Sequence, residues 1–167
     1  MRARLLTTLL IVAVACGSDG SGVAGEDYVT QIQRVSVNAH IQERGLARDL
    51  QRRLKQAGSQ AEKLEALKVF ADQSARLYQD VIDALDGLDP PADASRAQDR
   101  YGAAWGDQLK LIVKVRDAGF GVGDFLDTLE SQAFHDAANA TKNRCEQLQQ
   151  ALSADAAGVD LACDGKA

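Results

Sequence analysis

The chain contains little proline, few aromatic residues and almost no methionine, and each shortage restricts its fold or its chemistry. It has two prolines and 5% aromatic residues, and it lacks the alternating β-branched runs of sheet proteins. The abundant Ala, Leu, Gln, Glu and Arg instead favour helices. The only methionine is Met1 and the motif CxxCH is absent, which excludes His/Met ligation and covalent attachment of haem.

The N-terminus has the order of features found in an export signal. A short basic start with Arg2 and Arg4 precedes an apolar run of eleven residues from Leu5 to Ala15. A transmembrane helix needs about 20 apolar residues, whereas the core of a signal peptide needs roughly 7 to 15. We therefore predict that residues 1–15 are a signal peptide that is removed.

The residues at the predicted cleavage point resemble the lipobox of bacterial lipoproteins. They read Ala13-Val14-Ala15-Cys16, and the resemblance implies that Cys16 receives a diacylglyceryl group. Two acyl chains make attachment to a membrane stable. The prediction is a protein lipid-anchored through Cys16 to the extracytoplasmic face of a bacterial membrane, not spanning it. An ordinary secretory signal cut near Ala15 is the alternative.

The exported chain is acidic and long enough for one domain. Cleavage before Cys16 leaves 152 residues, with 17 basic and 24 acidic side chains and a formal net charge of −7. Binding to nucleic acid relies on a basic surface, so nucleic acid is not an expected partner. We predict a lipidated cysteine and flexible Gly/Ser-rich tether over residues 16–25, and a helical bundle domain with a disulfide-linked tail over residues 26–167.

Two cysteines remain after Cys16, and their pairing follows from the compartment. Cys145 and Cys163 form an even pair in an exported chain, which predicts a disulfide. A metal–thiolate site is the alternative, but the cysteines show no CxxC spacing and no histidine lies near them in the sequence.

Apolar side chains recur every three or four residues in four stretches, the period of amphipathic helices. The first predicted helix runs from near Glu26 to Ala57, and Gln42 and Gly45 predict a kink or break near residues 42–45. Its inward positions are Tyr28, Ile32, Val35, Ala39, Leu46, Leu50, Leu54 and Ala57. Those of the second helix are Leu64, Leu67, Ala71, Ser74, Tyr78, Val81, Leu85 and Leu88.

The remaining two helices are delimited by turn residues. Gly87 is expected to end the second helix, and Asp89 to cap the third ahead of Pro90 and Pro91. The third helix has the inward positions Ala97, Tyr101, Ala104, Gln108, Leu111, Val115 and Ala118, with Trp105 and Ile112 beside them. Asp124 is expected to cap a fourth helix with the inward positions Phe134, Ala138, Thr141, Cys145, Leu148 and Leu152.

The segment after Ser153 has a different pattern. Val159, Leu161 and Cys163 occupy alternate positions, which face the same way along an extended chain. Five or six extended residues cover the roughly 12 Å back to Cys145. The predicted fold is therefore all-α, a four-helix bundle with an extended C-terminal tail stapled by a disulfide.

Two segments carry a family resemblance. LDGLDPPAD, from Leu85 to Asp93, and CEQLQQALSADAAGVDLAC, from Cys145 to Cys163, resemble segments of small lipoproteins from GC-rich bacteria, notably actinobacteria. With the lipobox, the resemblance covers most of the exported chain. It implies a lipidated four-helix bundle with a disulfide-pinned tail, and it implies no activity.

His40 and Glu43 are the candidate metal ligands, because they place an imidazole and a carboxylate one helical turn apart. Di-iron bundles use two Glu-x-x-His motifs, and neither His40 nor His135 has a glutamate three residues before it. The Gly-x-His-x-x-Glu element of imelysin-like proteins is also incomplete, because Asn38 replaces its glycine. We predict no cofactor, a solvated helix face at His40 and Glu43, and a partly buried His135.

Two other features have a functional and a structural interpretation. The segment Gly119–Asp124 precedes a helix as phosphate loops do, but it lacks their strand and their Lys-Ser/Thr, so it is interpreted as a hinge. Arg44, Arg48 and Arg52 form a basic stripe that is interpreted as solvated surface, with contact to anionic lipid headgroups or an acidic partner as the alternative.

No catalytic constellation is recognisable, since there is no Gly-x-Ser-x-Gly elbow and the serines fall in the tether, turns or helix surfaces. The sequence therefore predicts a non-enzymatic interaction or ligand-binding module of the cell envelope, whose partner is an envelope protein or a small ligand. A metal- or haem-handling bundle that uses His40, Glu43 and His135 is the alternative, and a hydrolytic enzyme is the third hypothesis.

Overall fold

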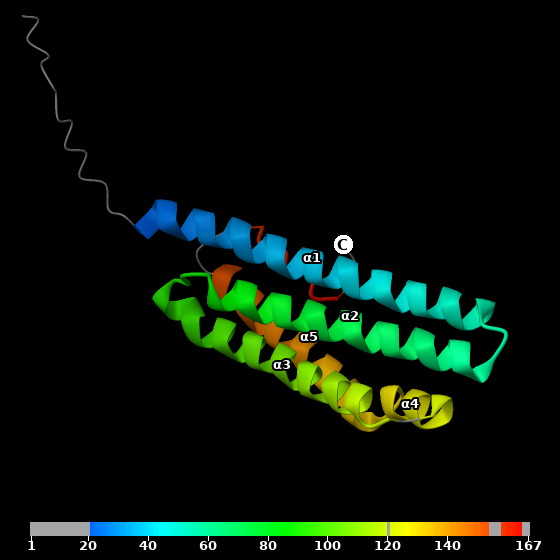
Figure 1. The fold of residues 1–167 in the computed structure, drawn as a ribbon. Helices are drawn as coiled ribbons and strands as arrows, with labels where there is room; N and C mark the ends of the chain where they lie inside the picture. Colours follow the sequence, from blue (N-terminus) through cyan, green and yellow to red (C-terminus); the bar gives the residue numbers. More distant parts are fainter. Residues whose placement is uncertain (1–20, 120, 154–157, 165–167) are drawn as a thin grey trace, which may run out of the picture.

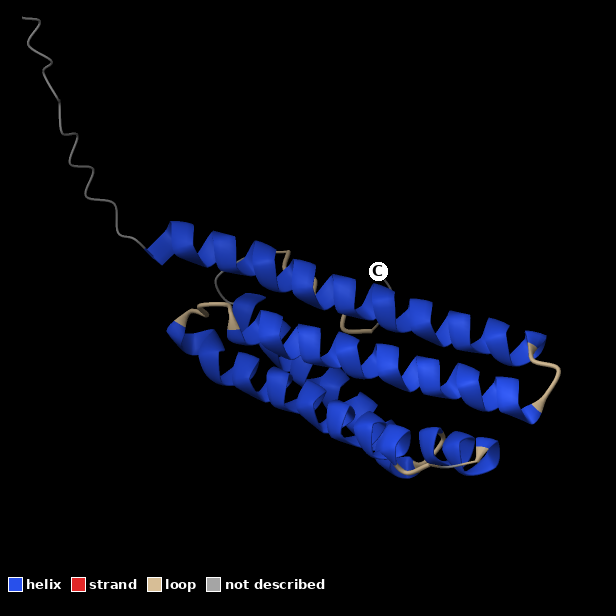
Figure 2. Ribbon diagram, viewed as in Figure 1, coloured by secondary structure: helices blue, strands red, loops and turns tan. Residues whose placement is uncertain are grey.

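Four long helices and one short helix form the described part of the chain (Figure 1). The computed structural model describes residues 21–119, 121–153 and 158–164. The helices are α1 (Ser21–Gln56), α2 (Gln60–Asp86), α3 (Ala92–Asp117), α4 (Val122–Leu129) and α5 (Gln132–Ser153). No β-strand occurs within these ranges, as Figure 2 shows. The predicted all-α bundle is confirmed.

Helix α1 is longer and more continuous than predicted. Its 36 residues extend for about 54 Å. It begins at Ser21 instead of near Glu26, so part of the segment predicted as a tether is helical. The break expected near residues 42–45 is wrong, because α1 continues through them. Gln42 is exposed, and one glycine costs a helix only about 1 kcal/mol, which packing of α1 against α2 offsets.

Helix α2 starts with a capping box. The Ser59 hydroxyl accepts a hydrogen bond from the Glu62 N–H, and the Glu62 carboxylate accepts one from the Ser59 N–H. The predicted inward face is confirmed: six of its members are buried, and Leu64 and Leu88 at its ends are half-buried. The buried six are Leu67, Ala71, Ser74, Tyr78, Val81 and Leu85.

Helix α3 begins later than predicted. Pro91, not Asp89, is its N-cap, and no side chain caps it. The reason is steric, because a cap at Asp89 would make Pro90 the first helical residue, and Pro91 disfavours helical backbone in the residue before it. Trp105 and Ile112, expected beside the buried face, are fully buried. Since α3 packs on both α2 and α5, its buried surface is wider than one seam.

The predicted fourth helix is two helices. Helix α4 has Gly121 as its N-cap, so the expected cap at Asp124 is wrong, and the chain turns at Glu130 before α5 begins. Phe125 is buried and anchors this short helix. The inward face of α5 includes Ala137 instead of Ala138, and the other predicted positions from Thr141 to Leu152 are buried as expected.

The C-terminal tail, residues 158–164, closes the bundle between α1 and α5. Helix α1 packs mainly on α2, and α5 packs mainly on α3. The tail is hydrogen-bonded to both outer helices: the Gln33 amide and the Ser36 hydroxyl on α1 donate to its carbonyls, and the Gln149 side chain on α5 accepts from the Leu161 N–H. Leu161 is 0% exposed. The tail therefore occupies a place in the core.

The disulfide between Cys145 and Cys163 joins α5 to the tail across a Cα–Cα distance of 5.6 Å. Val159, Leu161 and Cys163 are all buried, as the alternating pattern predicted. The alternation does not extend through the whole segment, because Ala162 is buried as well. Ala162 has a φ of 54°, and this left-handed turn redirects the chain just before the disulfide.

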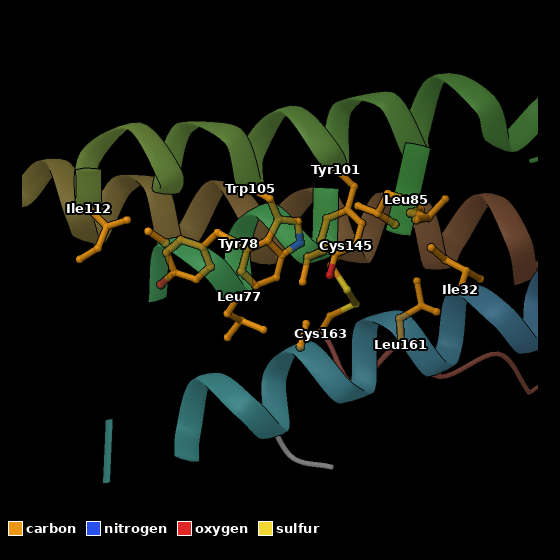
Figure 3. Close-up of a cluster of buried hydrophobic side chains, with 14 of the residues drawn as sticks. Ile32, Leu77, Tyr78, Leu85, Tyr101, Trp105, Ile112, Cys145, Leu161 and Cys163 are labelled. Carbon is orange, nitrogen blue, oxygen red and sulfur yellow. A yellow bond between two sulfur atoms is a disulfide. The ribbon is translucent and has the colours of Figure 1, made fainter. Parts of the chain in front are cut away.

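Aromatic rings fill the centre of the bundle around the fully buried Trp105 (Figure 3). The ring of Tyr78 lies 5.3 Å from that of Trp105, and the ring of Tyr101 lies 6.1 Å away, centroid to centroid. The centroid of the His40 imidazole lies 6.0 Å from that of the Trp105 ring. The core at this level is therefore polar as well as aromatic.

Candidate functional site

A small polar pocket lies where α1, α3, α5 and the tail meet. Its volume is about 170 Å³, roughly that of five or six water molecules. Helices α1 and α3 and the tail contribute two residues each, and α5 contributes three. They are His40, Glu43, Trp105, Gln108, Ala138, Thr141, Lys142, Cys163 and Asp164.

His40 is the most unusual residue in this pocket. It is 8% exposed, so the prediction of a solvated helix face is wrong for His40. The helical period predicts Ala39 as the inward residue. His40, the next residue, is buried as well, with its ring 6.0 Å from that of Trp105, centroid to centroid. His40 Nδ1 lies 3.8 Å from Glu43 Oε2, whereas the buried Nε2 has no hydrogen-bond partner among the described residues.

Glu43 connects His40 to the tyrosine next to Trp105. The Tyr78 hydroxyl donates a hydrogen bond of 3.1 Å to Glu43 Oε1. Burial raises the pKa of Tyr78, and the negative charge of Glu43 raises it further. Tyr78 therefore stays protonated and holds the carboxylate in place. The Glu43 side chain is 38% exposed, so the carboxylate lies between His40 and solvent.

The opposite wall of the pocket is fixed by hydrogen bonds between α3 and α5. Gln108 Nε2 donates to Thr141 Oγ1 at 2.7 Å, and the Thr141 hydroxyl donates to the Ala137 carbonyl at 3.1 Å. Both side chains are buried. This wall is therefore rigid and already hydrogen-bonded.

A second cluster ties the tail to the core. The Ser36 hydroxyl donates to the Leu161 carbonyl at 2.7 Å, and since it has one proton it accepts from the Tyr101 hydroxyl at 3.1 Å. Burial raises the pKa of Tyr101. Together with the disulfide, this cluster holds Cys163 and Asp164 at the pocket.

The structure brings together only two of the three candidate metal ligands. His40 and Glu43 are neighbours, but His135 does not line the pocket. His135 is exposed at the start of α5, so its predicted partial burial is wrong. Across the described ranges, no three or more His, Cys, Asp or Glu side chains are grouped to hold a metal ion. A metal- or haem-handling bundle stays a hypothesis.

The basic stripe lies on the second half of α1. Asp49 is among its arginines and pairs with Arg52 and Arg53. The hydrogen bond from Arg53 lowers the pKa of Asp49, so Asp49 keeps its charge and reduces the positive charge of this surface. Arg48, whose Nε donates to the Arg44 carbonyl, lies about 40 Å along α1 from Ser21. Contact between the stripe and a membrane stays a prediction, and it requires α1 to lie along the surface.

A larger hollow of about 370 Å³ lies between α2 and α3, over Gly102 and Gly106. Its buried polar residue is satisfied, because Gln98 donates to the Leu85 carbonyl and accepts from the Tyr28 hydroxyl. The smaller pocket is the better candidate site, since His40 Nε2 and Trp105 Nε1, the two buried side-chain atoms without a hydrogen-bond partner among the described residues, both belong to residues that line it.

The predicted signal peptide and the predicted lipidation site, Cys16, lie outside the described residues. Among the helices that are described, none combines the length and the hydropathy needed to cross a bilayer.

Comparison of the chain with protein-family models, with curated proteins and with solved structures finds no match. Neither these comparisons nor the pocket indicates an enzyme.

Proposed function

We propose that the protein is a lipid-anchored module on the extracytoplasmic face of a bacterial membrane and binds a small ligand in the pocket beside His40 and Glu43. The binding activity rests on one observation: two lining residues, His40 and Trp105, each have a buried ring nitrogen without a hydrogen-bond partner among the described residues. Leaving a buried polar atom unpaired costs about 1–3 kcal/mol, and a ligand that pairs with such an atom would offset the cost.

The anchor is supported by the sequence. A basic start, a short apolar run and Ala13-Val14-Ala15-Cys16 follow one another, and α1 begins five residues after Cys16. His40 lies about 28 Å along α1 from Ser21. An α1 that stands on the membrane would therefore hold the pocket well clear of the lipid headgroups.

The module is proposed to be non-enzymatic. The Thr141 hydroxyl that lines the pocket donates to the Ala137 carbonyl, and the cysteine that lines it is in a disulfide, so neither is placed as a nucleophile for His40 to activate. Binding without chemistry is the simpler role for a pocket of this composition.

Replacing the proposed acylated residue tests the anchor. In the Cys16→Ser variant expressed in a bacterial host that processes lipoproteins, the exported chain should leave the membrane fraction and be recovered without lipid. Ser18→Ala, two residues further on, is the matched control and should stay with the membrane. Equal membrane retention of the Cys16→Ser and Ser18→Ala variants would contradict the proposal.

A further inference from the structure

We infer that the disulfide between Cys145 and Cys163 is a redox-sensitive latch that controls access to the pocket beside His40. Reduction by an external dithiol releases the end of the tail and lets a small molecule reach the buried ring nitrogens. This inference gives the regulation of the proposed binding site and rests on that proposal. Three observations lead to it: the burial of the nitrogens, the composition of the pocket walls, and the unequal exposure of the two cysteines.

The two unpaired ring nitrogens are closed off from solvent. His40 Nε2 and Trp105 Nε1 are both buried, and the whole Trp105 residue is 0% exposed. A ligand has to lie within hydrogen-bond distance of such an atom to pair with it. Binding at these nitrogens therefore requires part of the pocket wall to move first.

The tail is the wall that moves at the lowest cost. The helical walls are held by packing, of α1 on α2 and of α3 on α5, and the hydrogen bond from Gln108 to Thr141 joins α3 to α5. The tail, residues 158–164, contains no helix and supplies the remaining wall. A short segment opens locally more readily than a long packed helix.

The disulfide holds the tail at the pocket. Hydrogen bonds from α1 attach the tail further back, at the carbonyls of Asp160 and Leu161. Cys163 lines the pocket and is bonded to Cys145 on α5, as Figure 3 shows. While this bond is intact, Cys163 cannot leave α5. The disulfide therefore acts as the latch of the wall that has to move.

The chemistry of the latch starts at Cys163, because Cys163 lines the pocket and is 9% exposed whereas Cys145 is 0% exposed. One thiolate of the dithiol attacks Cys163 Sγ, the disulfide breaks, and Cys145 Sγ leaves with the bonding electrons and takes up a proton. The second sulfur of the dithiol, as a thiolate, then attacks its own partner sulfur on Cys163. The dithiol becomes a disulfide, Cys163 leaves and becomes a thiol, and two electrons have passed to the protein.

Reduction opens the end of the tail without unfolding the bundle. The Leu161 side chain is 0% exposed, and the Leu161 backbone stays bonded to Ser36 and Gln149 when the disulfide is gone. The part of the tail at the pocket is then free to move away from α5, and the helices keep their packing. The expected change is local, at the pocket.

Access to His40 is measured with diethyl pyrocarbonate, which modifies ring nitrogens of histidine. The complete chain is purified in detergent, and mass spectrometry of its peptides reports His40 and the exposed His135 separately. In the oxidised wild type, His135 should react and His40 should be protected. In the Cys145→Ala/Cys163→Ala variant, which represents the open latch without thiols that consume the reagent, the rate at His40 relative to His135 should rise about tenfold.

A variant with a weakened core and an intact latch is the matched control. Val115 is buried on α3, about 15 Å along the helix from Trp105, and it does not line the pocket. Val115→Ala removes buried apolar volume and lowers stability without touching the tail. The relative rate at His40 should change by less than about twofold, because only local opening of the tail gives access.

The site of exchange is tested with a monothiol, which stops at the mixed disulfide. The folded wild-type chain is treated with 2-mercaptoethanol and quenched with acid, and its peptides are analysed by mass spectrometry. The reagent should be found on Cys163 and not on Cys145, since only Cys163 is reached from the pocket.

Four results would overturn the inference. They are a His40 as reactive as His135 in the oxidised wild type, a His40 protected equally with and without the disulfide, equal effects of the cysteine and Val115 variants, and a mixed disulfide on Cys145. The first would leave a pocket that is open to a ligand and has no latch. None of the four bears on the Cys16→Ser experiment, so failure of the latch is distinguishable from failure of the proposed function.

Discussion

Replacing both Cys145 and Cys163 with alanine removes the covalent link between α5 and the tail, and it should lower the free energy of unfolding by about 3 kcal/mol. The two cysteines are 18 residues apart. For a closed loop of this length, the chain-entropy model gives about 3 kcal/mol, because the link restricts the unfolded chain. In a domain of this size that loss corresponds to a melting temperature about 6–12 °C lower.

The expected loss is limited to this amount because the tail has other attachments. Ser36 and Gln149 still bond to the Leu161 backbone, and the Leu161 side chain still fills the core. The variant should therefore remain folded, with the tail opening more often. Hydrogen exchange at the Leu161 amide, which donates to Gln149, should become faster.

Urea denaturation followed by circular dichroism, without a reductant, measures the stability difference. The denaturant slope should increase in the variant, because its unfolded chain exposes more surface. The wild-type protein treated with a reductant should unfold like the variant. An unfolding free energy within about 0.5 kcal/mol of the oxidised wild type would refute the reasoning, since the link would then not restrict the unfolded chain.

Three further predictions concern other parts of the bundle. The three tyrosines Tyr28, Tyr78 and Tyr101 are buried and have raised pKa values in the folded state, so their stabilisation is complete below the ordinary pKa of about 10 and is lost as the pH rises above it, by about 4 kcal/mol per pH unit. Ultraviolet absorbance should show tyrosinate appearing only as the chain unfolds, and tyrosinate appearing near pH 10 in folded protein would contradict this. Ser36→Ala leaves the Tyr101 hydroxyl and the Leu161 carbonyl without their partner and should cost about 1–3 kcal/mol in urea denaturation, whereas no loss would mean that this cluster does not hold the tail. Gly45→Ala should raise stability by about 0.5–1 kcal/mol, because an added Cβ meets no atom within 4 Å in the interior of α1, and a decrease would show that α1 is not regular there.

The helical fold could be predicted because helix periodicity is local. The seam of α2 from Leu67 to Leu85 is regular, and the structure buries it. The tail could also be predicted, because alternation in Val159, Leu161 and Cys163 combined with one cysteine on the last helix left few arrangements. The sequence signals that were missed are also local: Ser59 and Glu62 form a capping box.

The pocket could not be predicted in the same way, because it depends on how helices pack. His40 lies next to Ala39 on α1, and periodicity alone assigns only one of them to the interior. Both are buried because α1 packs on α2 and also borders the tail, whose Cys163 and Asp164 line the same pocket as His40. The inward positions Gln108 and Thr141 were an available clue, since polar residues on a buried face must find partners.

The extent of the buried surface of α3 was underestimated for a related reason. The seam of three- and four-residue steps placed Trp105 and Ile112 at its edge. Helix α3 has neighbours on two sides, so both residues are in the core. A sequence gives the period of each helix but not the number of its neighbours.

Mass spectrometry of the N-terminal peptide of the natural protein tests the central claim most directly. The account predicts a chain that begins at Cys16, with the mass of a diacylglyceryl group on its sulfur. An N-terminal peptide that retains residues 1–15, or one that begins at an unmodified Cys16, would contradict it.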